Sequence, residues 1–253
     1  MHELPSKPFL DHLEDLRWLI IKVGITLALT IALGFIFTPQ ILDLLYEPLR
    51  RAGHDPQKIL RVLGVVDPFL IQMHASFLTG IILALPFTLY FIGEFLLPAL
   101  LPSERRLLIP VFTTGALLFL CGVAFCYFIL LPQALNFFIS YSRQFGLTVE
   151  WTLENYLNFT VNLLIAFGLC FELPLIILLL HNLEIITHHQ LRTHRRLAIL
   201  LIVIAAACIT PTTDFYTLTL LAAPMILLYE TCLLITHWLE KKKSARSQLP
   251  INP

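Results

Sequence analysis

A single carboxylate, Glu172, stands inside a long apolar run of this 253-residue chain, residues 155–183. That run is long enough to cross a bilayer as one helix. A carboxylate at such a depth is unfavourable unless it faces a protein interior, a wet cavity or a polar partner. At about 100° per residue, Asn158 and Asn162 fall within roughly 80° of Glu172 around the helix. The spacing predicts a polar stripe that contacts a polar group inside the membrane; a protonated acid that only packs against a neighbouring helix is the alternative.

A second group of acids lies near the N-terminus. Apolar residues recur there at helical spacing, and Asp11, Glu14 and Asp15 occupy other positions around the same helix. We expect residues 1–17 to form a cytoplasmic amphipathic helix that leads into the membrane. Such helices are often basic and bind anionic lipid, whereas an acidic one favours a basic peptide partner. A merely solvated charged face is the alternative.

Two further acids lie near predicted membrane boundaries. Glu104 follows Ser103, a suitable N-cap, so its carboxylate would suit the positive end of a helix dipole. The same carboxylate could equally bind a cationic ligand at the cytoplasmic face. Glu230 lies near the inner end of the last apolar run, where it is either a partner contact or an interface anchor.

Neither an enzyme nor a cofactor site is predicted. The sequence has no Walker A loop, no HExxH and no GxSxG motif. His188, His189 and His194 cluster, but no acid or cysteine stands at ligand spacing, so no metal site is expected. The five cysteines all lie in apolar runs. Any work that the protein does must therefore draw on an external gradient or a partner.

The elements that position these residues are predicted to be membrane helices. Hydrophobic residues make up 57% of the chain and charged residues 13%, with a mean hydropathy of +0.80, whereas soluble domains are about 25% charged. The net charge of zero argues against nucleic acid as a partner. We predict an all-α membrane protein with one polytopic domain, residues 1–253. Its six predicted transmembrane helices are residues 18–38, 69–97, 107–131, 155–183, 197–209 and 215–239, followed by a cytoplasmic tail at 240–253.

The distribution of lysine and arginine orients these helices. Twelve of these residues fall on the side of the termini and five on the other, which predicts that both termini are cytoplasmic. The fifth and sixth spans are short, and the 13 residues of the fifth reach only about 20 Å as a helix. A short span must thin the bilayer or be sheltered by its neighbours, so we expect a concave bundle with a partly hydrated wall.

Several motifs along the chain resemble the TatC family, the multi-span core of the twin-arginine protein translocase. His12-Leu13-Glu14-Asp15-Leu16-Arg17 is similar to an N-terminal family motif, and Phe167-Gly168-Leu169-Cys170-Phe171-Glu172-Leu173-Pro174 to the most specific one. Pro48, Phe95, Pro98, Glu104-Arg105-Arg106, Thr210-Pro211 and Tyr229-Glu230 match further positions. Asp15 stands where the family usually has glutamate, and Gly93 where tryptophan is frequent. The resemblance covers about residues 9–240.

The resemblance implies a receptor for folded precursor proteins whose signal peptides carry two adjacent arginines, in the bacterial cytoplasmic (inner) membrane. It assigns peptide binding to Glu104, Asp15 or Glu14, Arg17 and Phe95. It assigns contact with the single-span subunits TatA and TatB to Glu172, with Asn158, Asn162, Pro48 and Glu230 as further contacts. It also implies a homo-oligomer within a complex and transport driven by the proton-motive force.

Two other functions compete with this one. A proton-coupled transporter of a small solute could use Glu172 as its carrier site, but such transporters usually show inverted repeats and broken helices, and neither is visible. An intramembrane enzyme would need a nucleophile–base pair or a metal cluster within the spans, and the sequence offers none.

Overall fold

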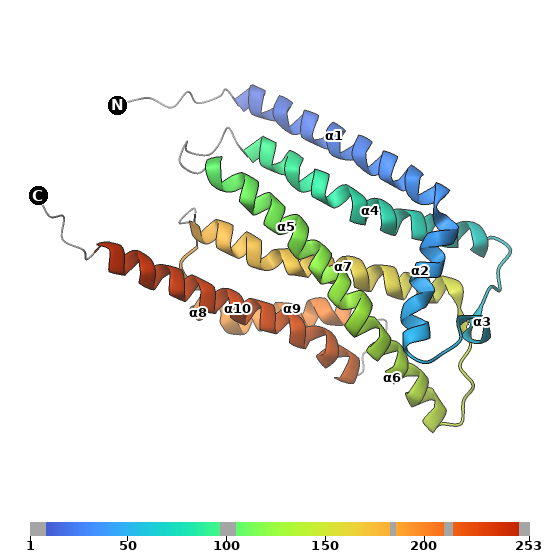
Figure 1. The fold of residues 1–253 in the computed structure, drawn as a ribbon. Helices are drawn as coiled ribbons and strands as arrows, with labels where there is room; N and C mark the ends of the chain where they lie inside the picture. The colour runs from blue at the N-terminus through green and yellow to red at the C-terminus, as the bar shows by residue number, and fades with distance from the viewer. Residues whose placement is uncertain (1–8, 97–104, 183–185, 210–214, 248–253) are drawn as a thin grey trace, which may run out of the picture. The chain divides into compact units, whose positions relative to one another are not determined.

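The computed structural model describes residues 9–96, 105–182, 186–209 and 215–247, and these residues are mostly helical (Figure 1). They fall into two compact units, residues up to 46 with 62–117, and residues 47–61 with those from 118 onward. The helices are α1 (Phe9–Ile36), α2 (Thr38–Arg51), α3 (Pro56–Ile59), α4 (Asp67–Leu96), α5 (Arg105–Phe125), α6 (Leu131–Gln144), α7 (Leu153–Asn182), α8 (His188–Thr193), α9 (Arg195–Ile209) and α10 (Phe215–Ser247).

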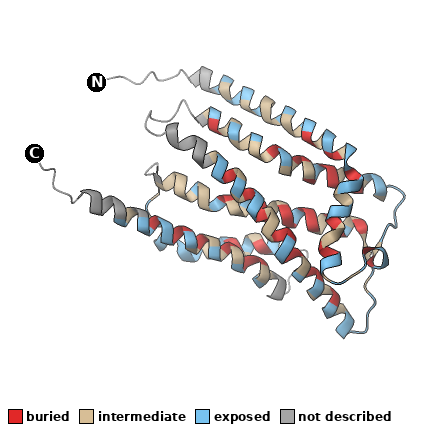
Figure 2. Ribbon diagram, in the orientation of Figure 1, coloured by how far each residue is buried: buried red, intermediate tan, exposed pale blue. Residues whose placement is uncertain are grey.

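Within the described residues, five helical segments are long and apolar enough to cross a membrane. They are Leu13–Ile36, Asp67–Phe95, Phe112–Gln144, Leu153–His181 and Leu218–Trp238. Large apolar side chains on them remain exposed, Ile20 and Leu29 each to 63% (Figure 2), which suits lipid as the surrounding solvent. The protein is therefore a mostly helical membrane protein. The predicted fifth span corresponds to α9, whose 15 residues reach about 22 Å, so helix length alone does not establish a count of six.

The predicted boundary between an N-terminal helix and a first span is not a break in the chain. Helix α1 runs without interruption from Phe9 to Ile36. No proline or turn sequence separates the acidic first turns from the apolar part, so nothing stops the hydrogen-bond ladder there. The acids are therefore rigidly connected to the membrane-crossing part of the same helix.

In the first unit, α1 and α4 run side by side (Figure 1). Their backbones approach closely at two glycines, since a Cβ on Gly34 would lie 2.9 Å from the Cα of Ser76, and one on Gly80 3.1 Å from the Cα of Ile31. The buried hydroxyl of Thr30 donates to the carbonyl of Gly80 at 3.0 Å. Small residues and interhelical hydrogen bonds are the usual means by which membrane helices associate.

The first part of α5 belongs to the same unit and packs on the C-terminal end of α4. The ring of Phe112 lies where a Cβ on Gly93 would stand. A side chain of any size at position 93 would displace that ring, so glycine there permits the close contact between the two helices.

In the second unit, the third predicted span is longer than expected. A π-helical turn at Cys126–Leu130 joins α5 to α6, and the N–H of Leu131 donates to the carbonyl of Cys126. This wider turn lets the helix pass Pro132, which has no N–H to donate. The segment predicted to end at residue 131 therefore continues to Gln144.

The core of the second unit forms where α5 and α6 meet α7. Gly168 faces the ring of Phe119, and a Cβ on Gly122 would lie 2.7 Å from the carbonyl oxygen of Phe167. Phe119 and Phe167 are both fully buried. The family-like sequence around Phe167 thus has a packing role in addition to any contact made by Glu172.

The prediction of an all-α fold is wrong in one detail. Strands β1 (Leu60–Arg61) and β2 (Trp151–Thr152) form a short parallel pair, in which Leu60 faces Trp151. Two extended connections between helices meet here and satisfy each other's backbone polar groups. Arg61 and Glu150 reinforce the junction, with 3.8 Å between Nη2 and Oε1. A strand of two residues is too short to show the alternation of apolar and polar residues by which strands are predicted from a sequence.

Helix α8 is fixed to α10. A capping box at Thr187 and Gln190 starts the helix. The His188 N–H donates to Oε1 of Glu240 at 2.9 Å, and the Tyr229 hydroxyl donates to the carbonyl of Leu191 at 2.9 Å. Helix α8 therefore has a defined place against the part of α10 between Tyr229 and Glu240.

Candidate functional site

The acids of the N-terminal motif lie on the first turns of α1. Glu14 and Arg17 are exposed, and Asp15 is half-buried. Asp15 precedes Lys22 by seven residues, which places the two on one face of the helix, about 10 Å apart along the axis. Asp15 thus shares the face of α1 on which Lys22 contacts α4, whereas Arg17 lies about 160° around the helix from Asp15.

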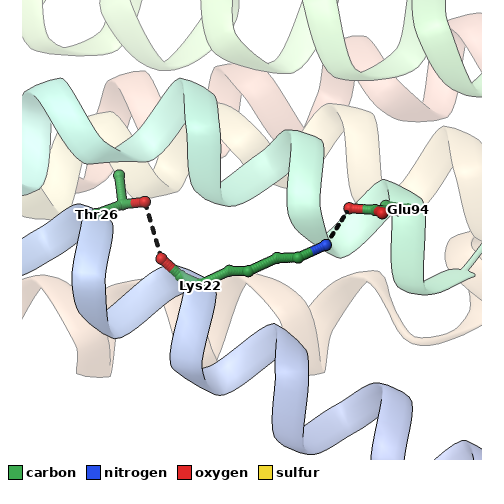
Figure 3. A network of polar contacts seen from close by, with 3 residues as sticks. All are labelled: Lys22, Thr26 and Glu94. Atoms are coloured by element: carbon green, nitrogen blue, oxygen red, sulfur yellow. Dashed lines mark hydrogen bonds and ion pairs between the residues drawn. The ribbon is translucent and has the colours of Figure 1, made fainter.

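An ion pair joins the middle of α1 to the C-terminal end of α4. Nζ of Lys22 lies 2.8 Å from Oε2 of Glu94, as Figure 3 shows. The ammonium also lies 5.7 Å from the centre of the Phe91 ring, within cation–π range. Phe95, the next residue after Glu94, is half-buried in the same turn of α4. Phe95 thus follows the glutamate of this ion pair directly, and Asp15 precedes its lysine by two helical turns.

Glu94 is a candidate that the sequence interpretation missed. Glu94 stands at the end of an apolar run, where a charged residue usually marks only the membrane boundary. Its position therefore did not suggest a function. The available signal was a lone lysine at the start of one run and a lone glutamate at the end of the next, since antiparallel neighbours bring such positions together.

Glu104 lies outside the described residues, so the structure does not place its carboxylate. The described part of helix α5 begins at Arg105, so the predicted N-cap at Ser103 also lies outside the described residues. Its role remains a prediction.

Glu172 is buried, with 6% of the residue exposed, and the segment that carries it spans the membrane as Leu153–His181. Within the part of the chain that the structure describes, its Oε1 atom has no hydrogen-bond partner. A buried oxygen without a partner is unfavourable. The carboxyl group is therefore covered by its own chain but not satisfied by it.

The three residues of the predicted polar stripe differ in exposure. Asn162 is exposed, Asn158 is half-buried and Glu172 is buried. The stripe is therefore open in the N-terminal half of α7 and covered at the level of the carboxylate. A partner can reach Asn162 directly, whereas the rest of the chain covers Glu172.

The two remaining predicted contacts have structural roles. Pro48 is buried inside α2, and its carbonyl accepts from the N–H of Ala52 at 3.0 Å. Glu230 on α10 forms an ion pair with Arg195 at the start of α9, with 2.6 Å between Oε1 and Nε. The two charged atoms are close, but they do not form a hydrogen bond. Among the described residues, Oε1 of Glu230 has no hydrogen-bond partner.

The segment between the first two membrane-crossing helices carries two groups with perturbed pKa values. Burial and the charge of Arg143 lower the pKa of His54 below 6.5, and a hydrogen bond with Asn136 opposes them. Burial, and secondarily the charge of Asp43, raises the pKa of Tyr46 above 10. In the described residues, no group of three His, Cys, Asp or Glu side chains could hold a metal ion.

Comparison with known proteins identifies the family. The family described as "Sec-independent protein translocase protein (TatC)" matches residues 11–224. The TatC protein of Koribacter versatilis is 35% identical over 229 residues, which cover 89% of this chain and 83% of that protein. The chain belongs to the TatC family.

Other members of the TatC family agree with this assignment. The TatC protein of Akkermansia muciniphila is 38% identical over 196 residues; these cover 78% of this chain but 56% of that longer protein. A crystal structure of the twin-arginine translocase receptor TatC in DDM is 33% identical, with a TM-score of 0.81, covering 89% of this chain and 99% of that one. The resemblance seen in the sequence motifs is confirmed.

Membership of the TatC family identifies the chain as a component of a Sec-independent, twin-arginine protein translocase, and hence as a membrane transport subunit. TatC is not a family of catalytic enzymes. The hypothesis of a small-solute transporter receives no support from these relatives, all of which are named as protein translocase components.

Proposed function

We propose that this chain is the receptor subunit of the translocase and that it binds the two adjacent arginines of a signal peptide at its cytoplasmic face. Glu104 and Asp15, with Glu14 beside them, supply the carboxylates, and Phe95 supplies an apolar contact. Guanidinium groups bind carboxylates through two parallel hydrogen bonds, which makes the pairing both strong and directional. Arg17, which is exposed, would help to orient the N-terminal turns.

The observation that carries this proposal is the position of Asp15. Its side chain is half-buried and shares a helix face with Lys22, which contacts α4, so a bound cation would be partly shielded from water. A charge pair in such surroundings interacts more strongly than it does in bulk solvent. Because α1 is one continuous helix, a peptide bound at its first turns would be held at a fixed position relative to the membrane.

The same proposal assigns partner contact to the intramembrane residues. Glu172 has a buried oxygen without a partner in the described structure, which a polar group of a single-span subunit such as TatA or TatB would satisfy. Asn158 and Asn162 would guide that contact from the exposed side of α7. Several copies of the chain would assemble with these subunits, and the proton-motive force would drive transport.

We further propose six spans in the bacterial cytoplasmic membrane, with both termini in the cytoplasm. Helix α9 is apolar but short, so it would cross only a thinned or sheltered part of the bilayer. Its first residues, Arg195 and Arg196, belong to the cytoplasmic group of basic residues on which the orientation rests.

The decisive experiment is photo-crosslinking of a twin-arginine signal peptide to the full chain in membranes. Glu104→Ala should reduce crosslinking at least tenfold, because a charge-assisted bidentate contact is lost, while the protein remains inserted. Glu172→Ala is the matched control: peptide crosslinking should persist, whereas contact with the single-span subunits should change. If Glu104→Ala crosslinked the peptide as strongly as the wild type does, the proposed peptide site would be wrong.

A further inference from the structure

The ion pair between Lys22 and Glu94 is exposed enough to exchange partners. The two side chains are 41% and 49% exposed, although their charged atoms lie 2.8 Å apart (Figure 3). Glu94 is the last residue but one of the candidate span Asp67–Phe95, so the pair lies at the membrane boundary. Exposed ion pairs that water can reach contribute little to stability. The pair is therefore a weak fastener of two helices that already pack closely at Gly34 and Gly80.

Glu94 lies within the surface that we propose for the peptide. Phe95 follows it directly, and Asp15 lies on the same face of α1 as Lys22, two helical turns nearer the N-terminus. A peptide with two adjacent cationic side chains can bind two carboxylates at once. Asp15 and Glu94 provide two such carboxylates on the α1–α4 pair.

We propose that Glu94 is a further carboxylate of this cation-binding surface, and that Lys22 is its resident counter-ion, which an arginine of the bound peptide displaces. The inference rests on the proposed function. An ammonium group is a compact point charge, whereas a guanidinium group is a planar fork that matches both oxygens of a carboxylate. A peptide arginine gains a second parallel hydrogen bond by replacing Lys22, but a peptide lysine only repeats the contact that Lys22 already makes.

The tethered lysine therefore makes Glu94 select arginine over lysine. Lys22 belongs to the same chain as Glu94, so it loses no translational or rotational entropy when it binds this carboxylate. A peptide lysine does lose this entropy, and it offers the same ammonium group, so it cannot displace Lys22 efficiently. The nearby Phe91 ring, 5.7 Å from Nζ, offers the displaced ammonium a second favourable position. Selection then depends on a repulsive competitor as well as on an attractive site.

The test uses the full chain in lipid nanodiscs and two fluorescent signal peptides, one with paired arginines and one with paired lysines. Affinities are measured for the wild type, Lys22→Gln, Glu94→Gln and the double variant. Lys22→Gln should strengthen binding of the lysine peptide about tenfold and of the arginine peptide by less, so discrimination falls. Glu94→Gln should weaken binding of the arginine peptide about three- to tenfold. Adding Lys22→Gln to this variant should not change the affinity further.

The matched control is Arg51→Gln, which breaks another exposed ion pair, that of Arg51 with Glu47 on α2, and should leave both affinities unchanged. If Lys22→Gln and Glu94→Gln lower thermal stability but leave the ratio of the two affinities at its wild-type value, the pair only fastens the helices and the inference is overturned. If the wild type fails to bind the arginine peptide at all, the proposed function falls and takes the inference with it.

Discussion

At the scale of single residues, the carboxylates of this chain fall into different physical situations. Glu94 is exposed and holds a cation, whereas Glu172 is buried with an oxygen that lacks a partner in the described structure. The first can exchange its partner in contact with water. The second can gain a partner only inside the membrane, which fits a role in subunit contact rather than in the first capture of a peptide.

His54 provides a prediction at the same scale. Its pKa is lowered in the folded state by burial and by Arg143, so between that value and 6.5 the unfolded chain binds more protons. Stability is therefore complete above pH 6.5 and is lost as the pH falls toward the lowered pKa. Melting temperatures in detergent between pH 8 and pH 5 should fall less for His54→Gln than for the wild type.

Arg143→Gln separates the two causes of this shift. It removes the repulsive charge but leaves His54 partly buried, so the loss of stability in acid should become smaller without disappearing. An equal acid response in the wild type and in His54→Gln would show that protonation of His54 does not oppose folding.

At the scale of elements, the α1–α4 pair depends on glycines that lack a Cβ. Gly34→Ala would place a methyl group 2.9 Å from the backbone of Ser76, and overpacking of this kind typically costs about 1–3 kcal/mol. Gly24→Ala in the same helix is the control, because nothing lies within 4 Å of a Cβ there. Unfolding in detergent should show a clear loss of stability for Gly34→Ala and none for Gly24→Ala. Equal stability of the two variants would mean that α1 and α4 do not pack as described.

At the scale of the whole molecule, the open question is whether α9 crosses the membrane. In a variant without the native cysteines, a single cysteine at Ser247 should react only with a reagent that reaches the cytoplasm if there are six spans. With five spans it would react from outside. His189→Cys marks the cytoplasmic side and Gln144→Cys the outer side in the same assay, since each lies next to a span that both counts share.

The sequence by itself determined the features that depend on local composition. Apolar runs predicted the long helices around Glu172 and Phe95, because a bilayer demands about 20 apolar residues as helix. The order of short motifs predicted the family. Helix ends were harder to predict: the break at Trp18 is absent and the end at residue 131 continues to Gln144, since a π turn and an uninterrupted ladder leave little local signal.

Tertiary structure alone decided which charged groups meet. Lys22 and Glu94 are 72 residues apart and become partners only because α1 packs against α4 at Gly34 and Gly80. The burial of Glu172 and the pairing of Glu230 with Arg195 likewise depend on neighbouring helices. Burial and ion pairing depend on which helices lie next to each other. The residue pattern within one apolar run does not specify its neighbours.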